Sequence, residues 1–164
     1  MRTVYLETTI VSYYVARTSR DLIIAARQEL TRKWWADKRS GYRLLASPAV
    51  REEARMGDRE AARRRLDLLT GPDIEFLKPS SEVDDLAETV REALAIPKTK
   101  KFDALHLAYA IKYGVDCLLT WNCSHFANPE ILRLLVNFCR ANDLWLPVVC
   151  TPEAMVGYGK ELDL

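Results

Sequence analysis

The sequence has no apolar run that approaches the about 18 residues needed for a membrane-spanning helix. Its N-terminus begins with a strand-like segment, Thr3–Leu6, and an acid, Glu7, interrupts it before the apolar core of a signal peptide forms. We therefore expect a cytoplasmic protein with no membrane partner.

An excess of charge of one sign is also missing, since 24 lysines and arginines against 23 acids leave a formal net charge of +1. Proteins that bind nucleic acid over a broad surface usually carry a larger positive charge, so any such contact here is expected to be local. Hydrophobic residues make up 49% and charged residues 29% of the chain, which indicates one globular domain over residues 1–164.

Cysteines are few, and their spacing matches no zinc-binding pattern. Three of the four lie in apolar stretches, where a thiol behaves as a small hydrophobic group, and we expect them to be reduced. Cys123 and His125 are close in sequence, but no acid stands nearby to orient the histidine, which disfavours a cysteine nucleophile. The cysteines are Cys117, Cys123, Cys139 and Cys150.

Short apolar segments alternate with helical patterns, with no repeat or linker between them. The predicted strands cover residues 3–6, 42–46, 74–77, 115–120 and 146–150. Helices are predicted over residues 10–15, 22–38, from 48, 81–96, 100–113, from 129 and from 152, three of them opened by a capping residue and a proline. The alternation predicts an α/β fold with three layers, in which helices cover both faces of a mostly parallel, about five-stranded sheet.

Acidic residues stand where ligands bind in such sheets, at the carboxyl ends of the strands. Glu7 ends the first strand, Glu52 and Glu53 follow the second, and Asp103 opens an apolar helix. Adjacent helix positions point about 100° apart, so only one of the two neighbouring glutamates is expected to face a site. Each acid also has a simpler explanation, as a solvated acid at a helix N-terminus, a charged helix face or a cap.

Four other polar residues are candidates for the same site. Asn122 offers a carbonyl oxygen after the fourth strand. The Thr9 hydroxyl either caps a helix or belongs to the site, where it would hold a metal-bound water or contact the substrate. His125 either contacts a phosphate or packs within its loop. His106, one turn after Asp103, is more simply explained as a hydrogen-bonded core residue than as a ligand.

The oxygen groups after several strands favour a divalent cation. Clustered carboxylates repel one another and raise their own pKa values unless a cation neutralises them. Oxygen ligands without a cysteine and histidine set suit Mg²⁺ or Mn²⁺.

Four segments together resemble the PIN-domain family, especially VapC-like toxins, over nearly the whole chain. They are Tyr5-Leu6-Glu7-Thr8-Thr9, Ser47-Pro48-Ala49-Val50-Arg51-Glu52-Glu53, Phe102-Asp103-Ala104-Leu105-His106-Leu107-Ala108 and Leu118-Leu119-Thr120-Trp121-Asn122. The register of the second segment selects Glu53 over Glu52. Two positions depart from the family pattern, because Glu7 stands where the family usually has Asp and Asn122 where it often has Asp.

The resemblance implies a metal-dependent endoribonuclease that hydrolyses RNA phosphodiesters to a 5′-phosphate and a 3′-hydroxyl, as the toxin of a type II toxin–antitoxin pair. It implies catalytic roles for four residues: Glu7 and Asp103 as direct ligands of Mg²⁺ or Mn²⁺, Glu53 as a ligand or water-positioning group, and Asn122 as a weak ligand. The alternatives are a catalytically weak PIN-fold module that binds RNA or a protein, and a DNA-directed nuclease.

Basic residues near these segments are candidates for binding the substrate, or are ordinary solvated faces. Lys98, Lys100 and Lys101 precede Asp103, and Arg63–Arg65 follow the Glu53 helix. A local basic patch supplies phosphate affinity without a large net charge.

Aromatic residues are plentiful on the early helices. Tyr13, Tyr14, Trp34 and Trp35 form either a surface for a homodimer or an antitoxin, or part of the core.

Overall fold

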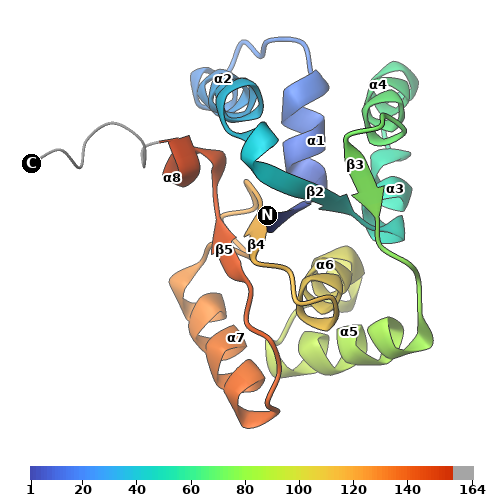
Figure 1. The fold of residues 1–164 in the computed structure, drawn as a ribbon, viewed down its shortest axis with the longest axis vertical. Coiled ribbons are helices and arrows are strands. Elements are labelled where there is room, and N and C mark those ends of the chain that lie inside the picture. The colour runs from blue at the N-terminus through green and yellow to red at the C-terminus, as the bar shows by residue number, and fades with distance from the viewer. Residues whose placement is uncertain (157–164) are drawn as a thin grey trace, which may run out of the picture.

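The computed structural model of the chain describes residues 1–156, which form a five-stranded sheet with helices on both faces (Figure 1). The strands are β1 (Arg2–Leu6), β2 (Tyr42–Ala46), β3 (Ile74–Phe76), β4 (Cys117–Leu119) and β5 (Val148–Cys150). Their order is β3-β2-β1-β4-β5, and every neighbouring pair is parallel. The predicted α/β fold with a parallel sheet is therefore confirmed.

Helices connect the strands and follow the last one, with short 3₁₀ turns at Arg39–Gly41 and Lys98–Lys100. They are α1 (Thr8–Val15), α2 (Leu22–Asp37), α3 (Pro48–Ala54), α4 (Arg59–Leu69), α5 (Ser81–Ala93), α6 (Lys101–Lys112), α7 (Pro129–Ala141) and the short α8 (Pro152–Val156). Figure 1 shows α1, α2 and α4 on one side of the sheet and α5, α6 and α7 on the other, which gives the three layers.

One helix, α4, was not predicted from the sequence. The Asp58 side chain caps its start by accepting a hydrogen bond from the Ala61 N–H at 2.9 Å. Its composition is rich in arginine, so only a narrow apolar face, with Ala62 and Leu69 buried, packs inward. The surplus of charged residues obscures the helical period of that face in the sequence.

The last two strands of the chain are shorter than predicted. β4 was predicted over residues 115–120 and β5 over residues 146–150, and each forms only three residues of ladder. Val115 and Leu146 lie in the segments that lead into these strands and do not pair. The periodicity of an apolar segment does not show where its partner strand ends, which sets the length of the ladder.

The aromatic residues of the early helices belong to the core rather than to an open surface. Trp34 and Trp35 are 0% and 4% exposed, and Tyr14 stacks on Trp35 with ring centroids 4.4 Å apart. Tyr13 lies half-buried against Trp121. A surface for a partner built on these tryptophans is therefore wrong, and the alternative of a core role is confirmed.

The central strand β1 lies between β2 and β4, so the strand order reverses beside it. Glu7 follows β1, Ser47 follows β2 and Thr120 follows β4, and all three are buried. In a parallel sheet, the point of reversal leaves a crevice at the carboxyl ends of the strands, which positions the candidate site. Across residues 1–156, none of the helices combines the length and apolar character that crossing a bilayer requires.

Candidate active site

Glu7 caps α1 and is held by hydroxyl groups from both neighbouring elements. Its Oε2 atom accepts hydrogen bonds from the Thr9 N–H at 3.1 Å, from the Thr9 hydroxyl and from the Thr120 hydroxyl at 2.8 Å. Its Oε1 atom faces the Nε2 atom of His106 at 4.0 Å. One carboxylate oxygen is thus used by the scaffold, and the other points toward the crevice.

The Glu7 carboxylate is 3% exposed, and burial raises its pKa, although His106 and the two hydroxyl groups partly offset this effect. Among residues 1–156, no lysine or arginine forms an ion pair with it. A buried carboxylate without a basic partner is costly when charged, and a bound cation removes that cost.

Glu53 approaches Glu7 from α3, which begins with the predicted Ser47-Pro48 cap. Its Oε2 atom lies 3.1 Å from the Nε2 atom of His106, whereas the neighbouring Glu52 is exposed. Partial burial raises the pKa of Glu53, but the hydrogen bond and the charge of His106 outweigh this, so its pKa is lowered. The prediction that Glu53 rather than Glu52 faces the crevice agrees with this geometry.

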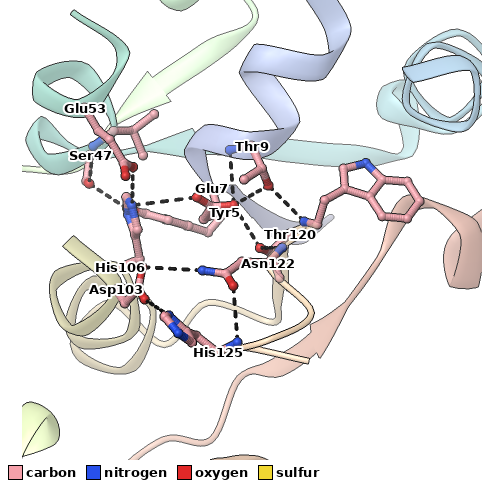
Figure 2. A network of polar contacts seen from close by, with 12 residues as sticks. Tyr5, Glu7, Thr9, Ser47, Glu53, Asp103, His106, Thr120, Asn122 and His125 are labelled. Atoms are coloured by element: carbon pink, nitrogen blue, oxygen red, sulfur yellow. Dashed lines mark hydrogen bonds and ion pairs between the residues drawn. The ribbon is translucent and has the colours of Figure 1, made fainter. Parts of the chain in front are cut away.

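His106 joins the two glutamates and is the residue that sequence reasoning underestimated. It is completely buried, as expected for a core residue, but its Nε2 atom faces both carboxylates. Its Nδ1 atom lies 2.8 Å from the Tyr5 hydroxyl, which in turn lies 2.6 Å from the Ser47 hydroxyl (Figure 2). The available signal was its position three residues after Asp103, which puts both on one face of the helix.

Asp103 and Asn122 form an adjoining group with His125. The Asn122 side-chain amide donates to Asp103 Oδ1 at 3.5 Å, and the His125 Nδ1 atom bonds to Asp103 Oδ2. Asn122 Oδ1 accepts from the His125 backbone N–H at 3.2 Å and from the Ser124 hydroxyl at 3.1 Å. Figure 2 shows this group beside the pair of glutamates.

The loop after β4 connects the two groups. The Thr120 hydroxyl donates to Glu7 and accepts from the Asn122 N–H at 2.9 Å. The Thr9 hydroxyl similarly donates to Glu7 and accepts from the Trp121 N–H at 2.9 Å. Thr9 therefore cross-links α1 to this loop, and its predicted contact with substrate remains a prediction.

The basic candidates divide into free and occupied side chains. Lys98, Lys100 and Lys101 are exposed beside Asp103, and within residues 1–156 none of them forms an ion pair. Arg64 instead pairs with Glu60 at 2.6 Å, and Arg65 donates to the Ala54 and Met56 carbonyls. The lysines are thus better placed to bind a phosphate. Two of the three arginines instead bond to other residues of the protein.

The donor atoms of Glu7, Glu53 and His106 fit a divalent cation, since one ligand atom from each lies within 4.8 Å of the others. The Thr8 hydroxyl, directly after Glu7, is buried and makes no hydrogen bond of standard geometry among the described residues, but it lies close enough to Glu53 to help lower the pKa of that carboxyl. Two carboxylates, one of them with a raised pKa, form a site of negative charge that a hard or borderline dication neutralises.

The chain shares a sequence pattern and a fold with known proteins. The model of the PIN domain family matches residues 4–122. No curated protein matches the sequence. Among solved structures, VapBC2 from Rickettsia felis bound to a DNA fragment from their promoter has a TM-score of 0.56 and 15% identity, and the match covers 91% of this chain and 98% of that chain.

Two further structures share the fold. VapC20 from Mycobacterium tuberculosis, a sarcin–ricin loop cleaving toxin, has a TM-score of 0.52 and 18% identity over 71% of this chain and 87% of that chain. VapBC-1 from nontypeable Haemophilus influenzae has a TM-score of 0.53 and 16% identity over 92% and 98%. The TM-scores show a common fold, and the family match spans β1 to the loop after β4, where the acidic site lies. The chain belongs to the PIN domain family.

Proposed function

We propose that the chain is a divalent-cation-dependent endoribonuclease and the toxin of a toxin–antitoxin pair. The observation that carries this proposal is the buried Glu7 carboxylate, which lies opposite Glu53 at the reversal point of the sheet and has no lysine or arginine partner among the described residues. The similarity of the fold to VapC toxins supports the same function.

Glu7 and Glu53 would hold the cation, with Asp103 and Asn122 acting from the adjoining group. A cation bound there lowers the pKa of a water molecule and stabilises the charge that develops on the phosphate. The protein's own contribution is orientation, because Thr9 and Thr120 fix one oxygen of Glu7 and His106 fixes Glu53. Because the two carboxylates are already held in place, they need no rearrangement when the phosphodiester enters.

The proposed substrate is single-stranded or looped RNA. A flexible backbone bends into a recessed acidic site that a duplex does not enter. Lys98, Lys100 and Lys101 lie at the start of α6, close to Asp103, where they attract the phosphates on either side of the scissile bond. One structural neighbour is itself a toxin that cleaves a defined loop.

An antitoxin protein and a second copy of the chain are the proposed protein partners. Two of the similar structures are VapBC assemblies, which supports a partner of the antitoxin class. The described residues that remain exposed and apolar, at the start of α2 and around β5, offer surface for such contacts.

The proposal is tested with purified protein, free of antitoxin, and an RNA that contains a hairpin loop. We expect cleavage with Mg²⁺ or Mn²⁺ and none with EDTA. Glu53→Gln should reduce the rate at least about a hundredfold, while the matched variant Glu52→Gln, one residue away on the exposed face, should cleave like the wild type.

Two outcomes would argue against this function. If the wild type cleaves no RNA with either cation, the chain acts as a binding module on the same fold. If it cleaves DNA and leaves RNA intact, the proposed substrate class is wrong, but the proposed cation site is not contradicted. Equal rates for Glu53→Gln and Glu52→Gln would remove Glu53 from the site.

A further inference from the structure

His106 has a fixed ring whose Nε2 atom faces both glutamates. The ring packs edge-on against Tyr5 and Phe126, with centroids 5.8 Å and 6.2 Å away, and it is completely buried. Its Nδ1 atom is anchored by the Tyr5 hydroxyl at 2.8 Å. These contacts leave the Nε2 atom no direction except toward Glu7 and Glu53 (Figure 2).

The chain of hydroxyl groups behind the ring accepts either tautomer of the imidazole. The Tyr5 hydroxyl has one proton to donate and lone pairs that accept, and it lies within hydrogen-bond distance of both Ser47 and Nδ1. In one arrangement Ser47 donates to Tyr5 and Tyr5 to Nδ1, and Nε2–H donates to Glu53. In the other, Nδ1–H donates to Tyr5 and Tyr5 to Ser47, which leaves the Nε2 lone pair free.

The second arrangement is the one that metal-binding histidines use. Such a histidine donates its other ring N–H to a neighbouring acceptor, which fixes the tautomer and the orientation of the ring. Atoms bound to one ion at about 2.1 Å lie about 3 Å apart when adjacent and about 4 Å apart when opposite. The Nε2 atom lies 3.1 Å from Glu53 Oε2 and 4.0 Å from Glu7 Oε1, within this range.

Building on the proposed function, we propose that His106 Nε2 binds the cation together with Glu7 and Glu53, and that this nitrogen ligand makes the site select Mn²⁺ over Mg²⁺. Mg²⁺ takes oxygen ligands and dehydrates reluctantly, whereas imidazole favours the first-row transition metals. A site built of carboxylates alone discriminates less between the two cations, because oxygen ligands suit both. Tyr5 and Ser47 are then positioning residues that present the correct face of the ring.

The nitrogen ligand is detected directly by pulsed electron paramagnetic resonance of Mn²⁺ bound to the full, untagged chain. An imidazole on Mn²⁺ gives a ¹⁴N modulation, and uniform ¹⁵N labelling of histidine must change it. The chain contains only two histidines, which provides a matched pair of variants. We expect the modulation in the wild type and in His125→Gln, and its loss in His106→Gln.

Calorimetry with Mn²⁺ and with Mg²⁺ gives the second measurement. His106→Gln should weaken Mn²⁺ binding at least about tenfold and Mg²⁺ binding less, so the ratio of Mn²⁺ affinity to Mg²⁺ affinity should fall. Tyr5→Phe keeps the ring and removes the anchoring hydroxyl, and it should weaken Mn²⁺ binding about tenfold even if His106→Gln does not fold.

Bound Mn²⁺ without histidine modulation in the wild type overturns the proposal, as does modulation that persists in His106→Gln. A wild type that binds no Mn²⁺, or that binds Mg²⁺ equally well, also overturns it. Both measurements are made without RNA. A histidine-bound Mn²⁺ in a protein that cleaves no RNA therefore supports this inference and contradicts only the proposed function.

Discussion

Glu7 is the residue whose environment says most about the site. Its buried carboxylate has three hydrogen bonds on one oxygen and only an imidazole near the other. The extra methylene relative to the aspartate usual in the resemblance is accommodated, because the hydroxyl groups of Thr9 and Thr120 hold the longer side chain at the helix start. The structure therefore shows how a glutamate fits a position that the family pattern gives to a shorter acid.

The first prediction concerns the stability of the metal-free protein. Burial raises the pKa of Glu7, so the folded state favours the neutral acid. Its stabilising contribution is complete below the ordinary carboxyl pKa and is lost as the pH rises through the raised value. In EDTA, Glu7→Gln should therefore raise the Tm at pH 7 by a few degrees and have little effect at pH 4.

The same comparison with saturating Mn²⁺ provides the control. Bound cation should raise the Tm of the wild type and leave Glu7→Gln nearly unchanged. If Glu7→Gln has a lower Tm than the wild type in EDTA at pH 7, the buried carboxylate does not destabilise the metal-free protein. That result would contradict this prediction.

The second prediction tests whether Asp103 contributes to cation binding, as is proposed for the two glutamates. Asp103→Asn is nearly isosteric and removes the charge that bonds to His125, so the fold should be kept while the affinity for Mn²⁺ falls at least about tenfold. Calorimetry on both proteins measures this. An unchanged affinity would show that Asp103 acts on the substrate and not on the metal.

At the scale of elements, the sheet is clamped at the end opposite the site. Asp116, at the start of β4, accepts hydrogen bonds at 2.8 Å from both the backbone N–H and the hydroxyl of Thr3 in β1, and the Asp116 N–H donates to that hydroxyl at 2.9 Å. These bonds tie the two strands that carry Glu7 and Thr120 at their other ends.

This clamp gives the third prediction. The hydrogen bonds from Thr3 lower the pKa of Asp116, so its contribution to stability is present above the ordinary aspartate pKa and is lost as the pH falls through the lowered value. Asp116→Asn, the neutral counterpart, should lower the Tm at pH 7, and the difference from the wild type should close in acid. A difference that stays constant with pH would mean that the charge has no part in the clamp.

The elements also show how far the sequence predicted the fold. Strand positions, the capped helix starts at Ser47-Pro48 and Asn128-Pro129, and the mostly parallel character of the sheet followed from local patterns. The helix α4 did not, because its arginines mask a narrow apolar face. The ends of β4 and β5 depend on pairing between strands, which no local pattern reports.

The sequence likewise predicted part of the candidate site. The positions of Glu7 and Asp103 followed from a strand end and one buried helix, and the choice of Glu53 over Glu52 followed from the family resemblance. The contact of His106 with both glutamates did not, because it depends on how α6 packs against β1 and α3. A buried histidine looks alike in sequence whether it faces a leucine or a carboxylate.

At the scale of the whole molecule, the exposed apolar residues mark the surface where we expect the proposed partners to bind. Leu22 and Ile23 at the start of α2 are 85% and 67% exposed, whereas the tryptophans of the same helix are buried. Two adjacent large apolar side chains in water mark a contact surface more often than an isolated one does.

The fourth prediction follows from this surface. We expect a homodimer by light scattering at micromolar concentration, and Ile23→Glu should shift it toward the monomer with less than about 0.5 kcal/mol of change in the stability of the fold. Met56→Glu, at another exposed apolar position, is the matched control and should keep the dimer. A wild type that is monomeric at every concentration would exclude self-association.

In the proposed reaction, a cation held by Glu7 and Glu53 activates water for attack on an RNA phosphodiester. Two histidines also lie at this site, and histidine-based ribonucleases use the RNA 2′-hydroxyl as nucleophile instead. Analysis of the cleaved ends, by mass spectrometry of a short looped RNA, distinguishes the two chemistries directly. Attack by a cation-activated water should leave a 5′-phosphate and a 3′-hydroxyl, formed only with Mg²⁺ or Mn²⁺. A 2′,3′-cyclic phosphate, formed equally well in EDTA, would instead show attack by the 2′-hydroxyl and contradict the proposed reaction.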